Sequence, residues 1–272
     1  MKKIILIMLF PFIGAYSQSN AQDLLTTPTR IVFEGNKQKG EVNLVNIGKD
    51  TATYSISFIQ YNMTEEGGFV TIEKPDSGQM YADSYLRVYP RKVILAPGEP
   101  QVIMLQYRRK PDMLAGEYRS HLYFRAETDN KPLGSGKKDT AALSVQLVPV
   151  YGLSIPVIIR NGEVNVNCTL SNLKLETKQD SIQIVRFTIN RMGNISIYGD
   201  VKIEYIPTGG LAVEVGEAKG VGVYTNINKR NFEMRLNNSA GKILNKGKLK
   251  IQYISNSKTN FKVFAQEEIE IK

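Results

Sequence analysis

The sequence predicts an all-β protein made of two sandwich domains. Short segments rich in Val, Ile, Tyr, Phe and Thr alternate apolar and polar side chains, and the period of an α-helix is hard to find after residue 21. Turn-forming pairs such as Gly67-Gly68, Pro97-Gly98 and Gly209-Gly210 separate these segments. The chain is also long enough for two ordinary domains, each able to bury its own core.

The clearest predicted strands carry an apolar side chain at every second position. They are the segments Tyr54-Ile56-Phe58, Leu122-Phe124, Val201-Ile203-Tyr205 and Leu249-Ile251-Tyr253. Polar residues occupy the positions in between, so each strand has one apolar face and one polar face. Strands of this kind cover a core on one side only, as the sheets of a sandwich do.

The N-terminus has the pattern of a secretory signal peptide over residues 1–21. Two lysines precede an apolar run that is too short to span a bilayer as a helix. Small residues at Ser19 and Ala21 fit the spacing that signal peptidase recognises, which predicts cleavage before Gln22, with cleavage after Ser17 as the alternative. We therefore expect an exported protein whose mature chain starts near Gln22.

The longest β-like run, residues 141–160, marks the predicted division between the domains. The turn pair Asn161-Gly162 follows it directly, and a new series of strands begins there. A polar loop rich in Gly and Lys, residues 128–140, leads into the run. We therefore expect a first domain over residues 22–160 and a second over residues 161–272.

The composition argues against an enzyme and against a nucleic-acid-binding protein. His121 is the single histidine and lies in an alternating strand, where a structural role is more common than catalysis. The carboxylates form no paired motif, and there is no phosphate-binding glycine loop. The net charge of +9 is not gathered into a basic stripe. The sequence thus predicts no catalysis, no cofactor, no metal and no nucleic-acid partner.

The single cysteine and the hydropathy pattern predict how the chain is stabilised and whether it is attached to a membrane. Cys168 has no second cysteine to form a disulfide with, and its expected place is a core. After the N-terminal run there is no stretch of roughly 18 apolar residues and no lipobox cysteine. The sequence therefore predicts neither a membrane span nor a lipid anchor.

Several motifs carry a resemblance to a known family. In the first domain they are Thr29-Arg30-Ile31-Val32-Phe33-Glu34-Gly35, Tyr89-Pro90-Arg91, Leu95-Ala96-Pro97-Gly98-Glu99 and Gly116-Glu117-Tyr118-Arg119-Ser120-His121-Leu122-Tyr123-Phe124-Arg125. In this order and spacing they resemble the PapD-like periplasmic chaperones of the chaperone–usher pilus pathway. Looser matches follow in the second domain, at Asn190-Arg191-Met192-Gly193-Asn194, Tyr198-Gly199-Asp200 and Val223-Tyr224-Thr225.

The resemblance implies two immunoglobulin-like sandwiches in an L-shaped arrangement, located in the periplasm. Members bind fimbrial subunits that lack the final strand of their own fold, and they deliver these subunits to an outer-membrane usher without nucleotide or metal. Such a subunit exposes an apolar groove and unpaired backbone edges until another chain donates a strand. The resemblance therefore implies pilus subunits and an usher as the partners of this chain.

In the family order, the run at residues 141–160 takes the place of the donor strand. Its alternation would present one row of apolar side chains to a subunit, namely Leu143, Val145, Leu147, Tyr151 and Leu153. A strand of the chaperone's own core would alternate in the same way. The pattern alone therefore leaves both interpretations open, and the position in the family order favours donation.

The family also holds the C-terminal carboxylate of the subunit with two basic side chains between the domains. Arg30 matches the first of them by its Thr-Arg-x-Val-Phe context, and its planar guanidinium can bind a carboxylate through two parallel hydrogen bonds. An ordinary exposed strand arginine is the alternative. The second anchor, a lysine in many members, is missing, because the two possible alignments place Pro156 or Tyr151 there.

The resemblance assigns a further role between the domains to Arg160. It matches the family arginine that ties the two domains together. The acidic partner expected on the preceding strand is replaced by Arg119, and Glu117, two residues away on the same face, is the possible substitute.

Two other function classes remain open from the sequence. A secreted β-sandwich adhesin or surface-binding protein would bind glycans or host proteins, but such proteins more often show an exposed aromatic platform, and this chain has no tryptophan. A secreted hydrolase would need His121, and its activity would be lost in His121→Ala.

Overall fold

The computed structural model describes residues 24–75, 79–127, 151–178, 182–237, 243–257 and 261–271. In these ranges the chain forms β-strands and one short 3-10 helix, η1 (Asp83–Tyr85), and no α-helix. The same ranges hold no helix with the length and apolar character needed to cross a membrane. The all-β class predicted from the sequence is confirmed.

The strands of the first sandwich form two sheets. In chain order they are β1 (Leu24–Thr27), β2 (Ile31–Phe33), β3 (Lys39–Asn46), β4 (Ala52–Met63), β5 (Phe69–Ile72), β6 (Leu86–Tyr89), β7 (Lys92–Leu95), β8 (Pro100–Tyr107), β9 (Gly116–Glu127) and β10 (Gly152–Asn161). One sheet has the order β1-β3-β8-β6, and the other has the order β2-β10-β9-β4 with β5 and β7 paired to β4. With β1 and β2 together as strand A, these are the A-B-E-D and A-G-F-C sheets of an immunoglobulin-like domain.

The second sandwich has the same kind of topology. Its strands are β11 (Val166–Thr177), β12 (Gln183–Gly193), β13 (Ile197–Pro207), β14 (Val213–Val223), β15 (Lys229–Arg235), β16 (Gly247–Ile254) and β17 (Val263–Ile271). They form the sheets β11-β12-β15 and β14-β13-β16-β17. These orders correspond to A-B-E and C′-C-F-G, so this domain is also immunoglobulin-like.

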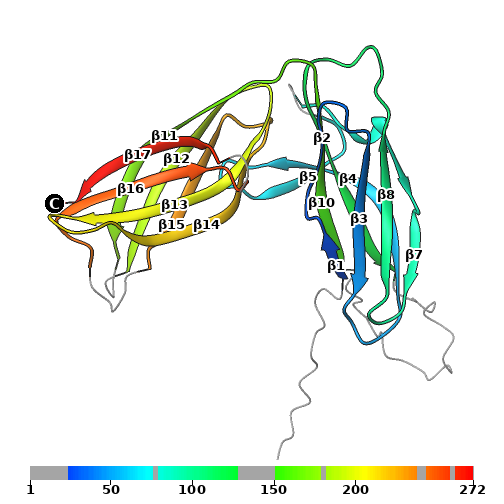
Figure 1. The fold of residues 1–272 in the computed structure, drawn as a ribbon, viewed down its shortest axis with the longest axis horizontal. Helices are drawn as coiled ribbons and strands as arrows, with labels where there is room; N and C mark the ends of the chain where they lie inside the picture. Colours follow the sequence, from blue (N-terminus) through cyan, green and yellow to red (C-terminus); the bar gives the residue numbers. More distant parts are fainter. Residues whose placement is uncertain are drawn as a thin grey trace, which may run out of the picture.

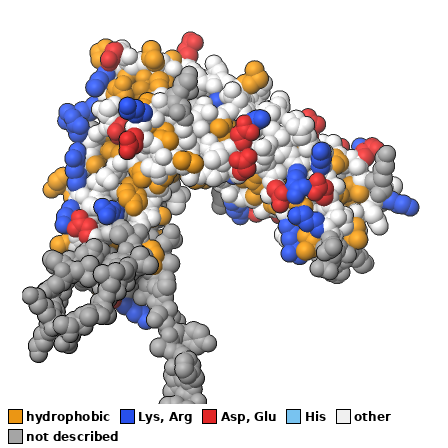
Figure 2. Space-filling model, turned by 180° about the vertical axis from the view of Figure 1, so that it is seen from behind, with side chains coloured by type: hydrophobic (Ala, Val, Ile, Leu, Met, Phe, Trp, Pro, Cys, Tyr) orange, Lys and Arg blue, Asp and Glu red, His pale blue; other side chains and the backbone are white. Residues whose placement is uncertain are grey.

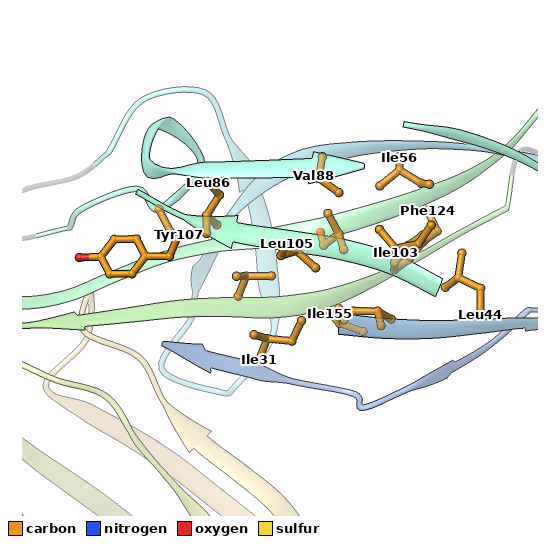
Figure 3. Packing of buried hydrophobic residues seen from close by; sticks show 14 of the residues in the cluster. Ile31, Leu44, Ile56, Leu86, Val88, Ile103, Leu105, Tyr107, Phe124 and Ile155 are labelled. Atoms are coloured by element: carbon orange, nitrogen blue, oxygen red, sulfur yellow. The ribbon is translucent and has the colours of Figure 1, made fainter. Parts of the chain in front are cut away.

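Each sandwich has its own hydrophobic core, made from the alternating residues that the sequence shows. In the first core, side chains from both sheets converge, and Figure 3 shows Ile31, Ile56, Ile103 and Phe124 among them. All four are buried, and burial of such a side chain contributes roughly 1.5–3 kcal/mol. Each domain can therefore be stable through its own packing.

The second core contains the lone cysteine. The predicted inward residues of β13 and β16, such as Val201 and Ile251, are fully buried, and Cys168 lies beside them as a free thiol. Burial raises the pKa of the Cys168 thiol to about 12, so it stays protonated and unreactive at neutral pH. The expectation that Cys168 is a core residue is confirmed.

The two sandwiches lie at an angle and meet at one end of each, which gives the L-shaped arrangement (Figure 1). Seen from behind, the surface is hollowed on the inner side of the bend (Figure 2). The β4–β5 hairpin extends from the first domain to the second. Its Met63 backbone exchanges two hydrogen bonds with the Asn226 side chain, at 2.9 and 3.3 Å, and Glu65 forms an ion pair with Lys229 at 3.2 Å.

Candidate functional site

Two adjacent parallel strands bring Arg30 and Arg160 to the junction between the domains. β2 pairs with β10 in parallel, with Ile31 opposite Val157 and Phe33 opposite Ile159. These four side chains belong to the core, so the residues between and beside them point to the outer face of the sheet. If this register is continued by one residue at each end, Arg30 lies beside Pro156 and Glu34 lies beside Arg160.

The third strand of this face is β9, which supplies the other charged groups. It pairs antiparallel with β10, so that Pro156 is opposite His121, Ile158 is opposite Arg119 and Arg160 is opposite Glu117. Three strands therefore place charged residues on one outer face, which the second sandwich covers. The sequence alone could not show this, because β2 and β9 lie more than 80 residues apart along the chain.

A cleft of about 490 Å³ lies between this face and the second domain. Arg30 and Arg160 line it from the first domain, and Ser196, Tyr198 and Asn256 line it from the second. The guanidinium carbon of Arg30 lies 4.3 Å from the centroid of the Tyr198 ring, within the range of a cation–π contact. The cleft thus combines two cationic side chains with hydrogen-bonding groups, which suits a small anionic group such as a carboxylate.

Arg30 has no carboxylate partner among the described residues, since it takes part in none of their ion pairs. Burial, together with the positive charges of Arg119 and Arg160, lowers the pKa of Arg30 to about 10, although the negative charge of Glu117 acts in the opposite direction. The side chain is still protonated at neutral pH. Its electrostatic surroundings favour the arrival of a negative charge.

Glu117 and Arg119 form a buried ion pair in the first domain, and Ser196 of the second domain hydrogen-bonds to it. Arg119 donates to Glu117 Oε1 through Nη2 at 2.6 Å and Nε at 3.1 Å. Ser196 of the second domain donates to Glu117 Oε2 through its backbone N at 3.0 Å and its hydroxyl at 2.7 Å. Burial alone would raise the pKa of Glu117, but the Arg119 charge and the Ser196 hydrogen bonds outweigh it, so the pKa is lowered.

Arg160 is bound more loosely than Arg119. Its Nη1 lies 3.3 Å from Oε2 of Glu34, a largely exposed carboxylate, and its Nε lies 3.8 Å from Oε2 of Glu117. The buried Nε donates no hydrogen bond to the described residues. Both carboxylates belong to the first domain, so neither of these two contacts of Arg160 reaches the second domain.

The donor-strand residues are only partly covered by the structure. Leu143, Val145 and Leu147 lie outside the described residues. Tyr151 is exposed and Leu153 is half-buried, and both share the parity of the core residues of β10.

The outer edge of β10 is incompletely paired. β2 pairs with Val157, Ile158 and Ile159, whereas no described strand pairs with residues 152–156 on that side. Among the described strands, the backbone edge of residues 152–156 therefore has no partner on this side and can pair with a further strand.

Some junction residues carried little signal in the sequence. Tyr198 and Tyr224 were visible only as parts of loose family matches, and Ser196 and Asn256 had no signal at all. Ser196 becomes a partner of Glu117 only when the two sandwiches meet, and such pairing between distant segments leaves no local pattern.

His121 also lies at the junction between the domains. Its Nε2 is 3.1 Å from the Tyr224 hydroxyl, and its ring contacts Tyr61 edge-on at a centroid distance of 4.9 Å and Phe69 at 6.4 Å. Burial and, to a smaller extent, the positive charge of Arg119 lower the pKa of His121 from its ordinary 6.5 to about 3. The imidazole ring of His121 is therefore neutral in the folded protein at neutral pH.

This pKa predicts a loss of stability in mild acid. The pKa of His121 is about 3 in the folded protein and 6.5 in the unfolded chain. The contribution of His121 to stability is therefore fully present above pH 6.5. It falls at lower pH, because the unfolded chain binds a proton at His121 that the folded protein does not. By pH 5 the free energy of unfolding should drop by about 2 kcal/mol. Urea unfolding at pH 7 and pH 5 measures this.

The control for this prediction is His121→Gln, which removes the titrating group. The carboxylate of Glu117 also has a lowered pKa, but its contribution is lost only as the pH falls below its ordinary 4.5. Between pH 6.5 and 5 the variant should therefore show a much flatter profile than the wild type. An unchanged slope in His121→Gln would contradict the assignment.

No protein-family model and no curated protein matches the chain. Among solved structures, the chain is similar to the YadV chaperone, with a TM-score of 0.45 and 11% identity over 92% of this chain and 100% of that chain. It is also similar to a chain of the chaperone–tip adhesin complex of CFA/I fimbriae biogenesis (TM-score 0.44, 16% identity, 92% and 99% of the chains). A third is the CupB2 chaperone of Pseudomonas aeruginosa (TM-score 0.43, 10% identity, 91% and 100%).

Proposed function

We propose that this protein is a periplasmic chaperone that binds, stabilises and delivers pilus subunits by donating a strand to them. The observation that carries the proposal is the position of Arg30. Its guanidinium lines the cleft between the domains without an ion-pair partner among the described residues, one strand away from the open edge of β10. A C-terminal carboxylate in the cleft would fix one end of a partner strand, and the edge of β10 would pair with the rest of it.

The proposal includes the division of labour along the chain. The N-terminal domain, residues 22–160, contributes the carboxylate site and the donor strand, and the C-terminal domain, residues 161–272, closes the cleft with Tyr198 and Ser196. The signal peptide places the protein in the periplasm, and an outer-membrane usher receives the subunit. Strand pairing and apolar burial provide the free energy for capture, so the function requires no catalysis, nucleotide or metal.

The proposal is tested in the organism that produces the chain. The tagged protein is isolated from the periplasm, and co-purified proteins are identified by mass spectrometry and then followed in a strain without the chaperone. We expect a secreted partner that lacks the last strand of a β-sandwich and that disappears from the periplasm in this strain. A chaperone recovered alone, or a partner whose level does not depend on it, would exclude the function.

A variant in the predicted donor strand tests the route of capture. Leu147→Asp would place a charge in the apolar groove of the subunit, so recovery of the partner should fall to background while the free chaperone stays folded. Leu211→Asp is the matched control, because Leu211 is 88% exposed in the second domain. If the free Leu147→Asp variant is itself unfolded, Leu147 belongs to the chaperone's own core and not to the donor row.

A further inference from the structure

We infer that Arg160 is the second anion-binding residue of the cleft, in place of the anchor lysine that is missing at its expected position. The inference rests on the proposed function, since it concerns how the partner's carboxylate is held. Arg160 lies four residues after Pro156, which occupies one of the two positions where the lysine was expected. Both Arg30 and Arg160 line the cleft, and the positive charge of Arg160 is one of the smaller causes that lower the pKa of Arg30.

The ion pair of Glu117 with Arg119 leaves Arg160 available. Both oxygens of Glu117 accept hydrogen bonds from Arg119 and Ser196, and Arg160 approaches this carboxylate only to 3.8 Å without a hydrogen bond. Glu117 is therefore already neutralised by a closer cation. An arginine whose acidic neighbour is used by another arginine keeps most of its capacity to bind a further anion.

The remaining partner of Arg160 is a weak competitor. Glu34 contacts it at 3.3 Å, and the side chain of Glu34 is 53% exposed. Ion pairs with a solvent-exposed carboxylate contribute little, because water competes for the carboxylate. The Nε–H of Arg160 is buried and has no acceptor among the described residues. A carboxylate that entered the cleft could accept a hydrogen bond from this Nε–H and displace Glu34. We therefore assign to Glu34 the role of an internal competitor for Arg160.

Acetate is a suitable probe, because it has the carboxylate of a chain terminus and no strand to pair with β10. The purified protein is titrated with acetate at pH 7 and constant ionic strength, and the arginine Nε–Hε signals are followed by NMR, with acetamide as the neutral control. The signals of Arg30 and Arg160 should shift together with one dissociation constant. Arg160→Gln should weaken acetate binding about tenfold, whereas Arg186→Gln, at an exposed ion pair of the second domain, should leave it unchanged.

Glu34→Gln separates this role from a structural one. Removal of the competitor should strengthen acetate binding several-fold in the wild-type background and should have little effect when Arg160→Gln is also present. A purely structural Arg160–Glu34 pair predicts no gain in either background. This comparison also remains informative if Arg160→Gln lowers stability, because Glu34→Gln alone leaves every arginine of the cleft in place.

The outcomes distinguish this inference from the proposed function. If only the Arg30 signal responds to acetate, and Glu34→Gln has no effect, Arg160 is not an anion ligand and the inference is wrong, while the chaperone function stands on subunit capture. If acetate shifts neither signal, the cleft does not bind a carboxylate, and the inference is wrong. If acetate binds as expected and no subunit depends on the chain in the periplasm, the proposed function is wrong and the anion site remains.

Discussion

Replacement of Glu117 by Ala is expected to reduce the free energy of unfolding by about 3–5 kcal/mol, the loss typical of a broken buried ion pair. Arg119 would then keep its charge at 6% side-chain exposure with no carboxylate to neutralise it, and Ser196 would lose its acceptor. Because these bonds cross from one sandwich to the other, the two domains should also become less firmly attached. Urea unfolding followed by circular dichroism measures the stability, and small-angle scattering measures the angle between the domains.

The matched control is Glu176→Ala, which removes a carboxylate from an exposed ion pair with Arg186. It should cost at most about 1 kcal/mol, because exposed pairs are well solvated when separated. The double variant Glu117→Ala/Arg119→Ala removes both charges, and it should be more stable than Glu117→Ala alone. A double variant that lost the sum of the two single effects would show that the pair is not coupled.

Replacement of Arg30 by Ala is expected to weaken subunit capture by about ten- to hundredfold. This is the loss that corresponds to a charge-assisted hydrogen bond of roughly 1.5–3 kcal/mol. The fold should be retained, because Arg30 has no ion pair among the described residues and its described contact is the Tyr198 ring. Recovery of the subunit from the periplasm measures the effect, and thermal unfolding of the free chaperone checks the fold.

Arg30→Lys tests the need for a planar guanidinium, since lysine keeps the charge but cannot form two parallel hydrogen bonds to one carboxylate. It should capture subunits nearly as poorly as Arg30→Ala. Arg87→Ala is the control, because Arg87 is exposed on β6, in the other sheet of the first sandwich. Deletion of the last residues of the subunit should mimic Arg30→Ala. If Arg30→Ala, Arg30→Lys and the truncated subunit all gave the same recovery as the wild type, the chaperone would not bind the carboxylate of the subunit.

The fold class and the side chains of the two cores can be predicted from local patterns in the sequence. Alternation with a period of two is a local property, so residues such as Ile56, Phe124 and Ile251 could be assigned to the inside of a sheet before any contact was known. Turn chemistry is local as well, and Gly67, Gly98 and Gly209 each have a positive φ in the structure, which glycine adopts at little cost. The place of Cys168 followed from its apolar character alone.

The pairing of the charged residues at the junction, in contrast, depends on contacts between distant strands. From the sequence, Arg119 was merely a residue that occupied the expected acidic position, and Glu117 was the possible partner of Arg160. In the structure Arg119 binds Glu117, and Ser196 completes the pair from 77 residues further along the chain. Which of two arginines obtains one carboxylate depends on strand register and on the packing of the second sandwich. Local periodicity predicts neither the register nor the packing, because both arise from contacts between segments that are far apart in the chain.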